Sequence, residues 1–137
     1  MALVCIGMLL VSCGSKRLDN PKAQFIRDFG LNIEKKDCVL EELFNNYEGV
    51  PYEGIALYKL TIGEDVRQAF LQWERFPFSE EAECFLESLS AYAELPSIAD
   101  GYWKMVDRNP GTSAYTNVSL CVYDGATGAA YLLTMDI

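Results

Sequence analysis

The 137-residue sequence contains no histidine. This absence removes the commonest general base, the commonest protein ligand of transition metals and the usual titrating group near neutral pH. A nucleophilic Ser or Cys activated by His is therefore excluded within this chain. The sequence also lacks G-x-S-x-G, Ser-x-x-Lys and a phosphate-binding Gly-rich loop. No familiar catalytic motif therefore takes the place of a His-activated nucleophile.

Positive charge is scarce. Lys and Arg together number 11 against 20 Asp and Glu, which gives a formal net charge of -9. Between residues 41 and 100 the only cations are Lys59, Arg67 and Arg75. Such a surface repels phosphate backbones, so no nucleic-acid partner is expected. The acidic excess is either a solvated surface that keeps the protein soluble, or a docking face for a basic protein partner or small ligand.

A hydrophobic run long enough to span a membrane is not found in the sequence. The apolar stretch Ala2–Val11 has about half of the roughly 20 residues that a spanning helix needs. Its length fits the apolar region of a secretory signal peptide. The residues that follow it, Gly14-Ser15-Lys16, are typical of a flexible tether.

The run Leu10-Val11-Ser12-Cys13 resembles the lipobox of bacterial lipoproteins. The resemblance implies a signal peptide over residues 1–12, removal of that signal, and a diacylglyceryl group on the Cys13 thiol. Residues 13–20 would then be the lipidated cysteine and its tether, and the chain would be held at the extracytoplasmic face of the cell membrane. Met1–Val4 lacks the cations that usually begin a signal. An upstream start, or a core strand or helix that buries Cys5 and Cys13, therefore stays open.

Three cysteines lie beyond the proposed lipidation site: Cys38, Cys84 and Cys121. No two of them have the C-x-x-C spacing of zinc or redox sites, so we expect neither a metal nor another cofactor. Each stands beside hydrophobic residues, which predicts small buried side chains. Three thiols allow at most one internal disulfide.

The remaining pattern predicts a single α+β domain over residues 21–137. It would hold an antiparallel sheet of about four or five strands, two central helices and a short N-terminal helix. Asn20 as N-cap, Pro21 and the terminating Gly30 place the first helix at about 21–29. Residues 37–46 are ambiguous, because Val39, Leu43 and Tyr47 fit a helix whereas Cys38, Leu40 and Phe44 partly fit an alternating strand. Strands are expected at 54–62, 101–107, 117–123 and 129–137.

The two central helices are bounded by recognisable signals. Residues 64–73 carry apolar side chains on one helical face, and a second helix begins after the N-cap Ser79 and stops before Pro96. The stretch Asp124–Gly128 contains some residues of a calcium loop, but its glycines are more typical of a hairpin turn.

One group of side chains suggests a ligand site. Tyr102, Trp103, Arg108 and Tyr123 combine aromatic rings with a planar cationic donor, a composition common at contact surfaces. A competing interpretation is purely structural, because Tyr102 and Trp103 are adjacent on a strand and would point to opposite faces.

The resemblance to lipoproteins extends beyond the lipobox. The chain is similar to a group of small lipoproteins of Gram-positive anaerobes. That group often has a Gly/His-rich loop near residues 45–54, where this chain has NNYEGVPYEG. Together, these observations predict a membrane-anchored extracytoplasmic domain with a non-catalytic binding role. The alternative is an envelope hydrolase that depends on carboxylates or on a Cys with an unusual base. The similar segments are Asp28-Phe29-Gly30, Trp73, Phe76–Ser79, Leu95–Ile98, Gly101–Arg108 and Tyr123–Tyr131.

Overall fold

The structure, a computed structural model, describes residues 21–31, 33, 38–49, 53–111 and 116–137. The predicted signal peptide, Cys5, Cys13 and the tether lie outside these residues. Among the helices described, none is both long and apolar enough to cross a membrane.

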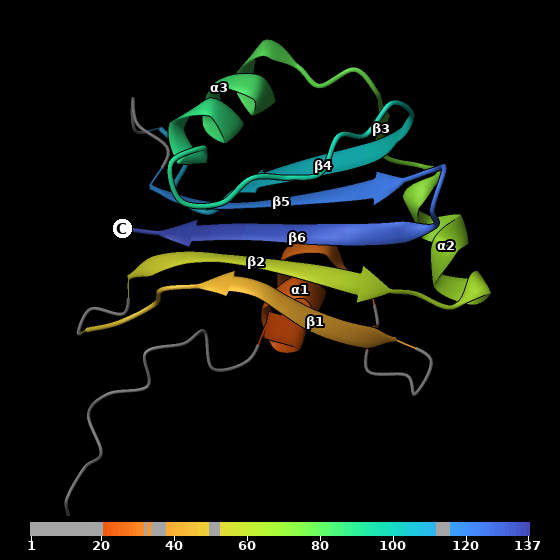
Figure 1. Cartoon of the computed structure of the whole chain (residues 1–137), viewed down its shortest axis with the longest axis horizontal. Helices are drawn as coiled ribbons and strands as arrows, with labels where there is room; N and C mark the ends of the chain where they lie inside the picture. Colours follow the sequence, from red (N-terminus) through yellow and green to blue (C-terminus); the bar gives the residue numbers. More distant parts are fainter. Residues whose placement is uncertain (1–20, 32, 34–37, 50–52, 112–115) are drawn as a thin grey trace, which may run out of the picture.

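The domain is α+β, with a single antiparallel sheet of six strands in the order β1-β2-β6-β5-β4-β3 (Figure 1). The C-terminal strand β6 lies between β2 and β5, near the middle of the sheet. The strands are β1 (Val39–Asn45), β2 (Gly54–Thr61), β3 (Glu74–Arg75), β4 (Gly101–Asp107), β5 (Asn117–Asp124) and β6 (Ala129–Asp136).

The expected count of four or five strands was too low, because both edge strands give weak sequence signals. β1 comes from the ambiguous segment 37–46, and its exposed Val39 and Leu43 disturb the alternation expected of a half-buried strand. A register shift between Glu42 and Phe44 disturbs it further. β3 has two residues, too few for any periodicity to be recognised.

The three helices match the expected ones, with shorter ends for two of them. α1 spans Pro21–Phe29, as predicted. α2 covers Glu64–Phe70 rather than extending to residue 73, because Trp73 leaves the helix and packs against Phe29 and Phe70, with ring centroids 5.5 and 4.6 Å away. α3 spans Glu80–Leu89.

α3 begins at the predicted cap but stops well before Pro96. The Ser79 hydroxyl oxygen accepts a hydrogen bond from the Ala82 amide at 3.1 Å. At the other end, the Ser90 amide donates to the Glu87 carbonyl at 3.2 Å, which tightens the last turn and ends the helix. Residues 90–92 form a turn, and residues 93–96 are irregular instead of helical.

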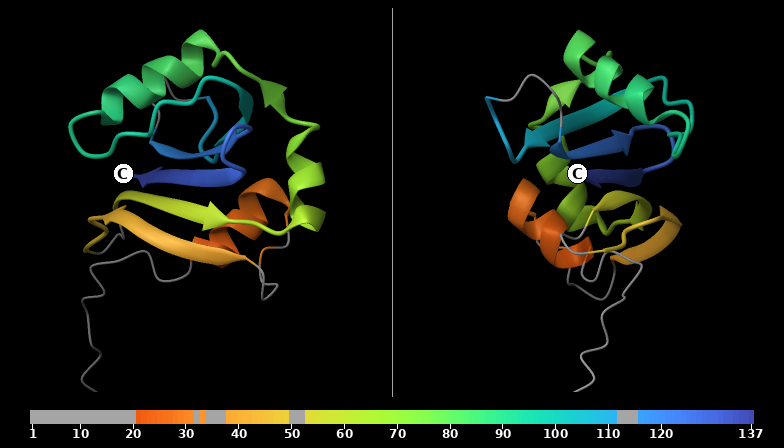
Figure 2. Two further views of the ribbon diagram at one scale, coloured as in Figure 1. Left: turned by 45° about the vertical axis from the view of Figure 1, so that its right-hand side comes forward. Right: turned by 90° about the vertical axis from the view of Figure 1, so that its left-hand side faces the viewer.

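Both faces of the sheet are covered, and each carries its own hydrophobic core. On the face that we call the α1 face, α1 and α2 pack on alternate residues of β2, β5 and β6, including Tyr58, Cys121 and Leu132. On the opposite α3 face, α3 packs on the residues between them, such as Leu57 and Leu120. The right-hand view of Figure 2 separates α1 and α3 on different sides of the strands. The central strands are therefore buried on both sides.

The three described cysteines are free thiols, and only two of them are buried. Cys38 and Cys121 lie in the core of the α1 face, as expected. The prediction was wrong for Cys84, which is exposed on α3. Burial raises the pKa of the Cys121 thiol, so its reactive thiolate form is suppressed.

Alkylation should reveal this difference directly. In the native protein at pH 8 we expect iodoacetamide to modify Cys84 quickly and to leave Cys38 and Cys121 largely unmodified, as measured by peptide mass spectrometry. The same reaction in denaturant should modify all three and serves as the control. Equal native rates at Cys84 and Cys121 would contradict the burial described here.

Candidate functional site

The α1 face contains a buried polar cluster centred on Arg108, at the end of β4. Its Nη1 donates a hydrogen bond to Asp28 Oδ2 of α1 at 2.9 Å, and its Nη2 pairs with Asp136 of β6. The Asp28 side chain is only 3% exposed and the Arg108 side chain 17%. Ser119 of β5 donates to the same Asp28 oxygen at 2.7 Å and also contacts the Arg108 guanidinium.

Further polar side chains complete this cluster. Gln24 Nε2 donates to the Thr134 hydroxyl at 2.6 Å, and the Tyr47 hydroxyl donates to Asp136 Oδ2 at 2.7 Å. The cluster joins α1 to three strands, so its first role is to hold the N-terminal helix on the sheet. We call the following residues the Arg108 network: Gln24, Asp28, Tyr47, Arg108, Ser119, Thr134 and Asp136.

Tyr47 gives this network a measurable pH dependence. Burial, followed by the hydrogen bond to the Asp136 carboxylate, raises the pKa of Tyr47 far above its ordinary value of 10.0. A folded-state pKa above the unfolded one stabilises the fold below pH 10, and this stability is lost as the pH rises further.

Above pH 10, Tyr47 should therefore lower the free energy of unfolding by about 1.4 kcal/mol per pH unit. Tyr47→Phe should lose about 1 kcal/mol at pH 7, because the bond to Asp136 is removed, but show a shallower decline between pH 10 and 11. Urea unfolding at each pH measures both effects. Tyr92→Phe, at an exposed tyrosine, is the matched control and should keep the parent slope. An unchanged slope in Tyr47→Phe would contradict the assignment.

The four residues predicted to form a ligand site do not gather around one opening. The Arg108 guanidinium is already paired with Asp28 and Asp136, so it does not face an open site. Tyr123 stacks on Phe70, with ring centroids 5.1 Å apart, and Tyr102 lies beside it on the α1 face. Trp103 faces the other way, and its Nε1 donates to the Pro77 carbonyl at 3.3 Å. Tyr102 and Trp103 thus point to opposite faces, as the structural interpretation expected.

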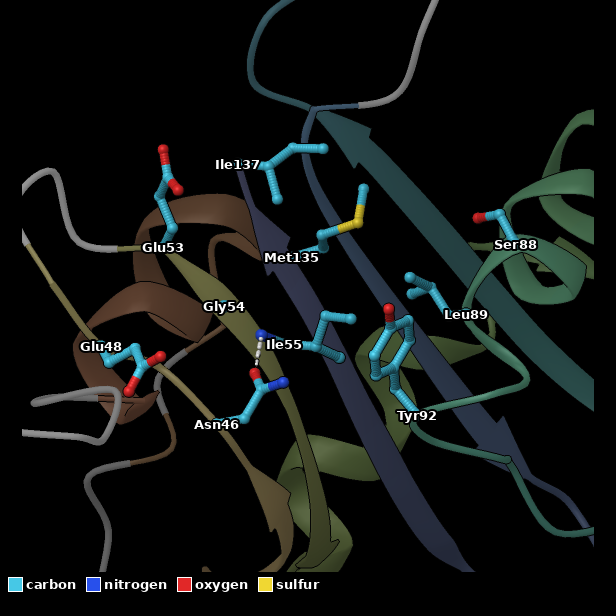
Figure 3. A pocket seen from close by; sticks show the side chains of 10 residues that line it. All are labelled: Asn46, Glu48, Glu53, Gly54, Ile55, Ser88, Leu89, Tyr92, Met135 and Ile137. Carbon is cyan, nitrogen blue, oxygen red and sulfur yellow. Dashed lines mark hydrogen bonds between the residues drawn. The ribbon is translucent and has the colours of Figure 1, made fainter.

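A different part of the fold forms an open pocket. It has a volume of about 530 Å³ and lies on the α3 face, between the last turn of α3 and the end of the β1–β2 hairpin (Figure 3). This volume is within the range of about 300–1,000 Å³ that is usual for small-molecule sites. We call this opening the hairpin pocket, and its lining residues are Asn46, Glu48, Glu53, Gly54, Ile55, Ser88, Leu89, Tyr92, Met135 and Ile137.

The floor of the hairpin pocket is apolar. Ile55, Leu89 and Met135 belong to the core of the α3 face and come from β2, α3 and β6. Tyr92 stands at the side and is 57% exposed. An apolar floor with an exposed aromatic ring offers a ligand contact area that is already formed.

The rim of the hairpin pocket is polar and fixed by the hairpin backbone. Glu48 and Glu53 are bridge partners: each amide donates to the other's carbonyl, at 2.9 and 3.2 Å. Their carboxylates are exposed. Asn46 Oδ1 accepts a hydrogen bond from the Ile55 amide at 2.7 Å, which holds the side chain so that its Nδ2 points toward the Tyr92 side of the pocket (Figure 3).

Close backbone contact shapes this end of the hairpin. A Cβ atom on Gly54 would lie 2.5 Å from Tyr47 Cα, a separation that real side chains do not show. The absence of a side chain at Gly54 therefore lets the chain pass directly over Tyr47. The hairpin end thus links the Arg108 network, through Tyr47, to the hairpin pocket on the opposite face.

Sequence reasoning missed the hairpin pocket because its walls come from distant segments. The available signal was the connector between β1 and β2, in which Asn and Glu residues surround Gly54. Tyr92, an aromatic residue just beyond the end of α3, was a second signal. Neither stretch indicates a site until the sheet brings residues 46–55, 88–92 and 135–137 together.

Comparison with protein-family models, curated proteins and solved structures finds no match. The hairpin pocket and the Arg108 network therefore have to be interpreted from their own chemistry. Membership of the lipoprotein group stays a prediction from the sequence.

Proposed function

We propose that this chain is a lipid-anchored extracytoplasmic domain that binds a ligand at the cell surface without chemical conversion. The observation that carries the proposal is the hairpin pocket, with its apolar floor, exposed tyrosine and polar rim. The lipobox-like sequence supports the location, because acylation at Cys13 would supply a membrane anchor that the described helices do not.

The position of α1 is compatible with such an anchor. α1 begins at Pro21, directly after the predicted tether, and packs on the face of the sheet opposite to the hairpin pocket. A membrane attachment that leads into α1 therefore enters the domain on one face while the pocket opens on the other.

The polar groups at the hairpin pocket favour binding over catalysis. The Ser88 hydroxyl donates to the Phe85 carbonyl at 2.6 Å, so its proton is directed at the backbone and not at a side-chain base. Of the three described thiols, none lines the pocket. The raised pKa of Cys121 further weakens a Cys-dependent mechanism.

One observation keeps a carboxylate-dependent hydrolase as a second candidate: Glu48 and Glu53 share the same rim. Glycoside hydrolysis uses two such carboxylates on either side of the scissile bond. That candidate predicts turnover of a glycan substrate, with a loss of about a hundredfold or more in Glu48→Gln. Binding without turnover, retained in Glu48→Gln with only reduced affinity, favours the non-catalytic proposal.

Occlusion of the hairpin pocket tests the binding role. Ser88→Trp should fill the opening, whereas Ser97→Trp places the same ring on the loop after α3, outside this pocket. We expect ligand-observed NMR with envelope extracts to detect small molecules that bind the parent and Ser97→Trp proteins but not Ser88→Trp. Identical binding profiles for all three proteins would contradict the assignment of the pocket.

Metabolic labelling tests the anchor separately. Labelled palmitate should enter the full chain and Cys5→Ala, and should be absent from Cys13→Ala. The parent protein should also fractionate with membranes. Recovery of the unmodified, uncleaved chain from the cytosol would contradict the proposed location.

A further inference from the structure

We propose that the hairpin pocket selects a cation, a primary ammonium or guanidinium group carried on an apolar stem with a neighbouring carbonyl, as in a lysyl or arginyl residue. The inference rests on the proposed function, because it names the ligand class of the same pocket. Charge, shape and hydrogen-bonding capacity each support it.

Negative charge at the hairpin pocket comes from its rim and from the end of α3. Glu48 and Glu53 are the only ionisable carboxylates among the ten side chains drawn in Figure 3, and no Lys or Arg is among them. The last turn of α3 contributes Ser88 and Leu89 to the wall. A helix C-terminus carries partial negative charge, and α3 has no basic residue in its last turn to offset it. All of these groups attract a cation.

The apolar floor of the hairpin pocket suits an apolar stem on the ligand. Ile55, Leu89 and Met135 form a floor that would contact methylene groups and exclude water from them. The exposed ring of Tyr92 stands beside this floor, where it can also contact a cation through its π face. A small inorganic cation would leave the floor unused, and an anionic lipid or phosphate would be repelled by the rim.

Asn46 supplies the third element. Its oxygen is held by the Ile55 amide, so the group presented to the ligand is the Nδ2 donor. A donor next to a cation-attracting rim calls for an acceptor on the ligand close to its positive charge. A carbonyl on the same molecule meets this requirement, which favours an amino-acid or peptide unit over a simple amine.

The test is a methyl NMR titration of the full chain in detergent micelles. The probe is Nα-acetyl-lysine methylamide, and its Nε-acetylated form has the same stem without the charge. We expect saturable shifts at the methyl groups of Ile55, Leu89 and Met135 with the charged probe, and at least tenfold weaker binding of the neutral one. Butylamine, which has the same single ammonium group on a four-carbon stem but no carbonyl, should bind more weakly than the charged probe. Equal binding of butylamine would overturn the carbonyl contact.

Charge-neutral variants locate the cation. Glu48→Gln and Glu53→Gln should each weaken binding of the charged probe by about three- to tenfold. Glu74→Gln removes the same charge from β3 at the opposite edge of the sheet and should leave the affinity unchanged. Raising the salt concentration should weaken binding to the parent more than to Glu48→Gln.

Two negative results have different meanings. If the neutral probe shifts the same methyl groups with equal affinity, and the Glu→Gln variants bind like the parent, the cation proposal is overturned while the pocket remains a ligand site. If neither these probes nor any component of envelope extracts shifts those methyl groups, both the cation proposal and the proposed function fail.

Discussion

Replacing Arg108 by Met is expected to lower the free energy of unfolding by about 3–5 kcal/mol. The substitution leaves the Asp28 carboxylate, only 3% exposed, without its main positive partner. Within the part of the chain that the structure describes, Asp28 also pairs with Arg27 at 3.4 Å, but the Arg27 side chain is 68% exposed, so that pair is strongly screened by water. A nearly buried charge without compensation is among the most destabilising changes available to a domain.

Urea unfolding at pH 7 measures this loss, and two further variants make it interpretable. Arg75→Met breaks the exposed pair with Asp100, whose side chains are 70% and 67% exposed, and should cost less than about 1 kcal/mol. Adding Asp28→Asn to Arg108→Met removes the stranded charge and should recover at least about 1 kcal/mol. A loss in Arg108→Met no larger than that in Arg75→Met would contradict the central role of the Arg108 network.

The second large effect is expected at Gly101, where Gly101→Ala should cost about 2–4 kcal/mol. A Cβ atom there would overlap the carbonyl oxygen of Tyr123 on the neighbouring strand, and would lie 3.0 Å from the carbonyl carbon. These are backbone atoms, which cannot rotate away as a side chain would. β4 and β5 would have to separate where Gly101 pairs with Asp124.

Gly125→Ala is the matched control, because it adds the same methyl group beside the same pair of strands. The nearest atom to its Cβ is the Asp100 oxygen at 3.3 Å, which a small adjustment can accommodate. Neither glycine has φ in the left-handed region, so strain of that kind does not separate them. Equal midpoints of urea unfolding for Gly101→Ala and Gly125→Ala would show that the close approach is unimportant.

Much of the fold could be predicted from local patterns. Pro21 and Gly30 marked both ends of α1, and Ser79 marked the start of α3, because caps act over a few neighbouring residues. The alternation in residues 54–62 correctly separated Leu57 from Tyr58 on opposite faces. The edge strands were harder, since no residue of β1 is fully buried and its half-buried positions do not follow a period of two.

The site could be predicted only in fragments, because it depends on contacts between distant residues. Arg108 was recognised as a noteworthy donor, but its partner Asp28 is 80 positions away and nothing local connects them. The glutamates of the hairpin pocket looked like any other surface charge until Tyr92 was placed opposite them. Composition indicated that the surface is acidic. Only the tertiary structure shows that two of the acidic side chains lie beside an apolar floor.

The central place of β6 has a consequence for the order in which this molecule assembles. The hairpin of β1 with β2 and the pair of β4 with β5 share no hydrogen-bonded edge until β6 enters between them. The packing of α1 also depends on β6, since the Gln24 side chain donates a hydrogen bond to Thr134 of β6, 110 positions away. Contacts of such long range slow folding. A nascent chain therefore cannot join its two halves into one sheet until β6 has been synthesised.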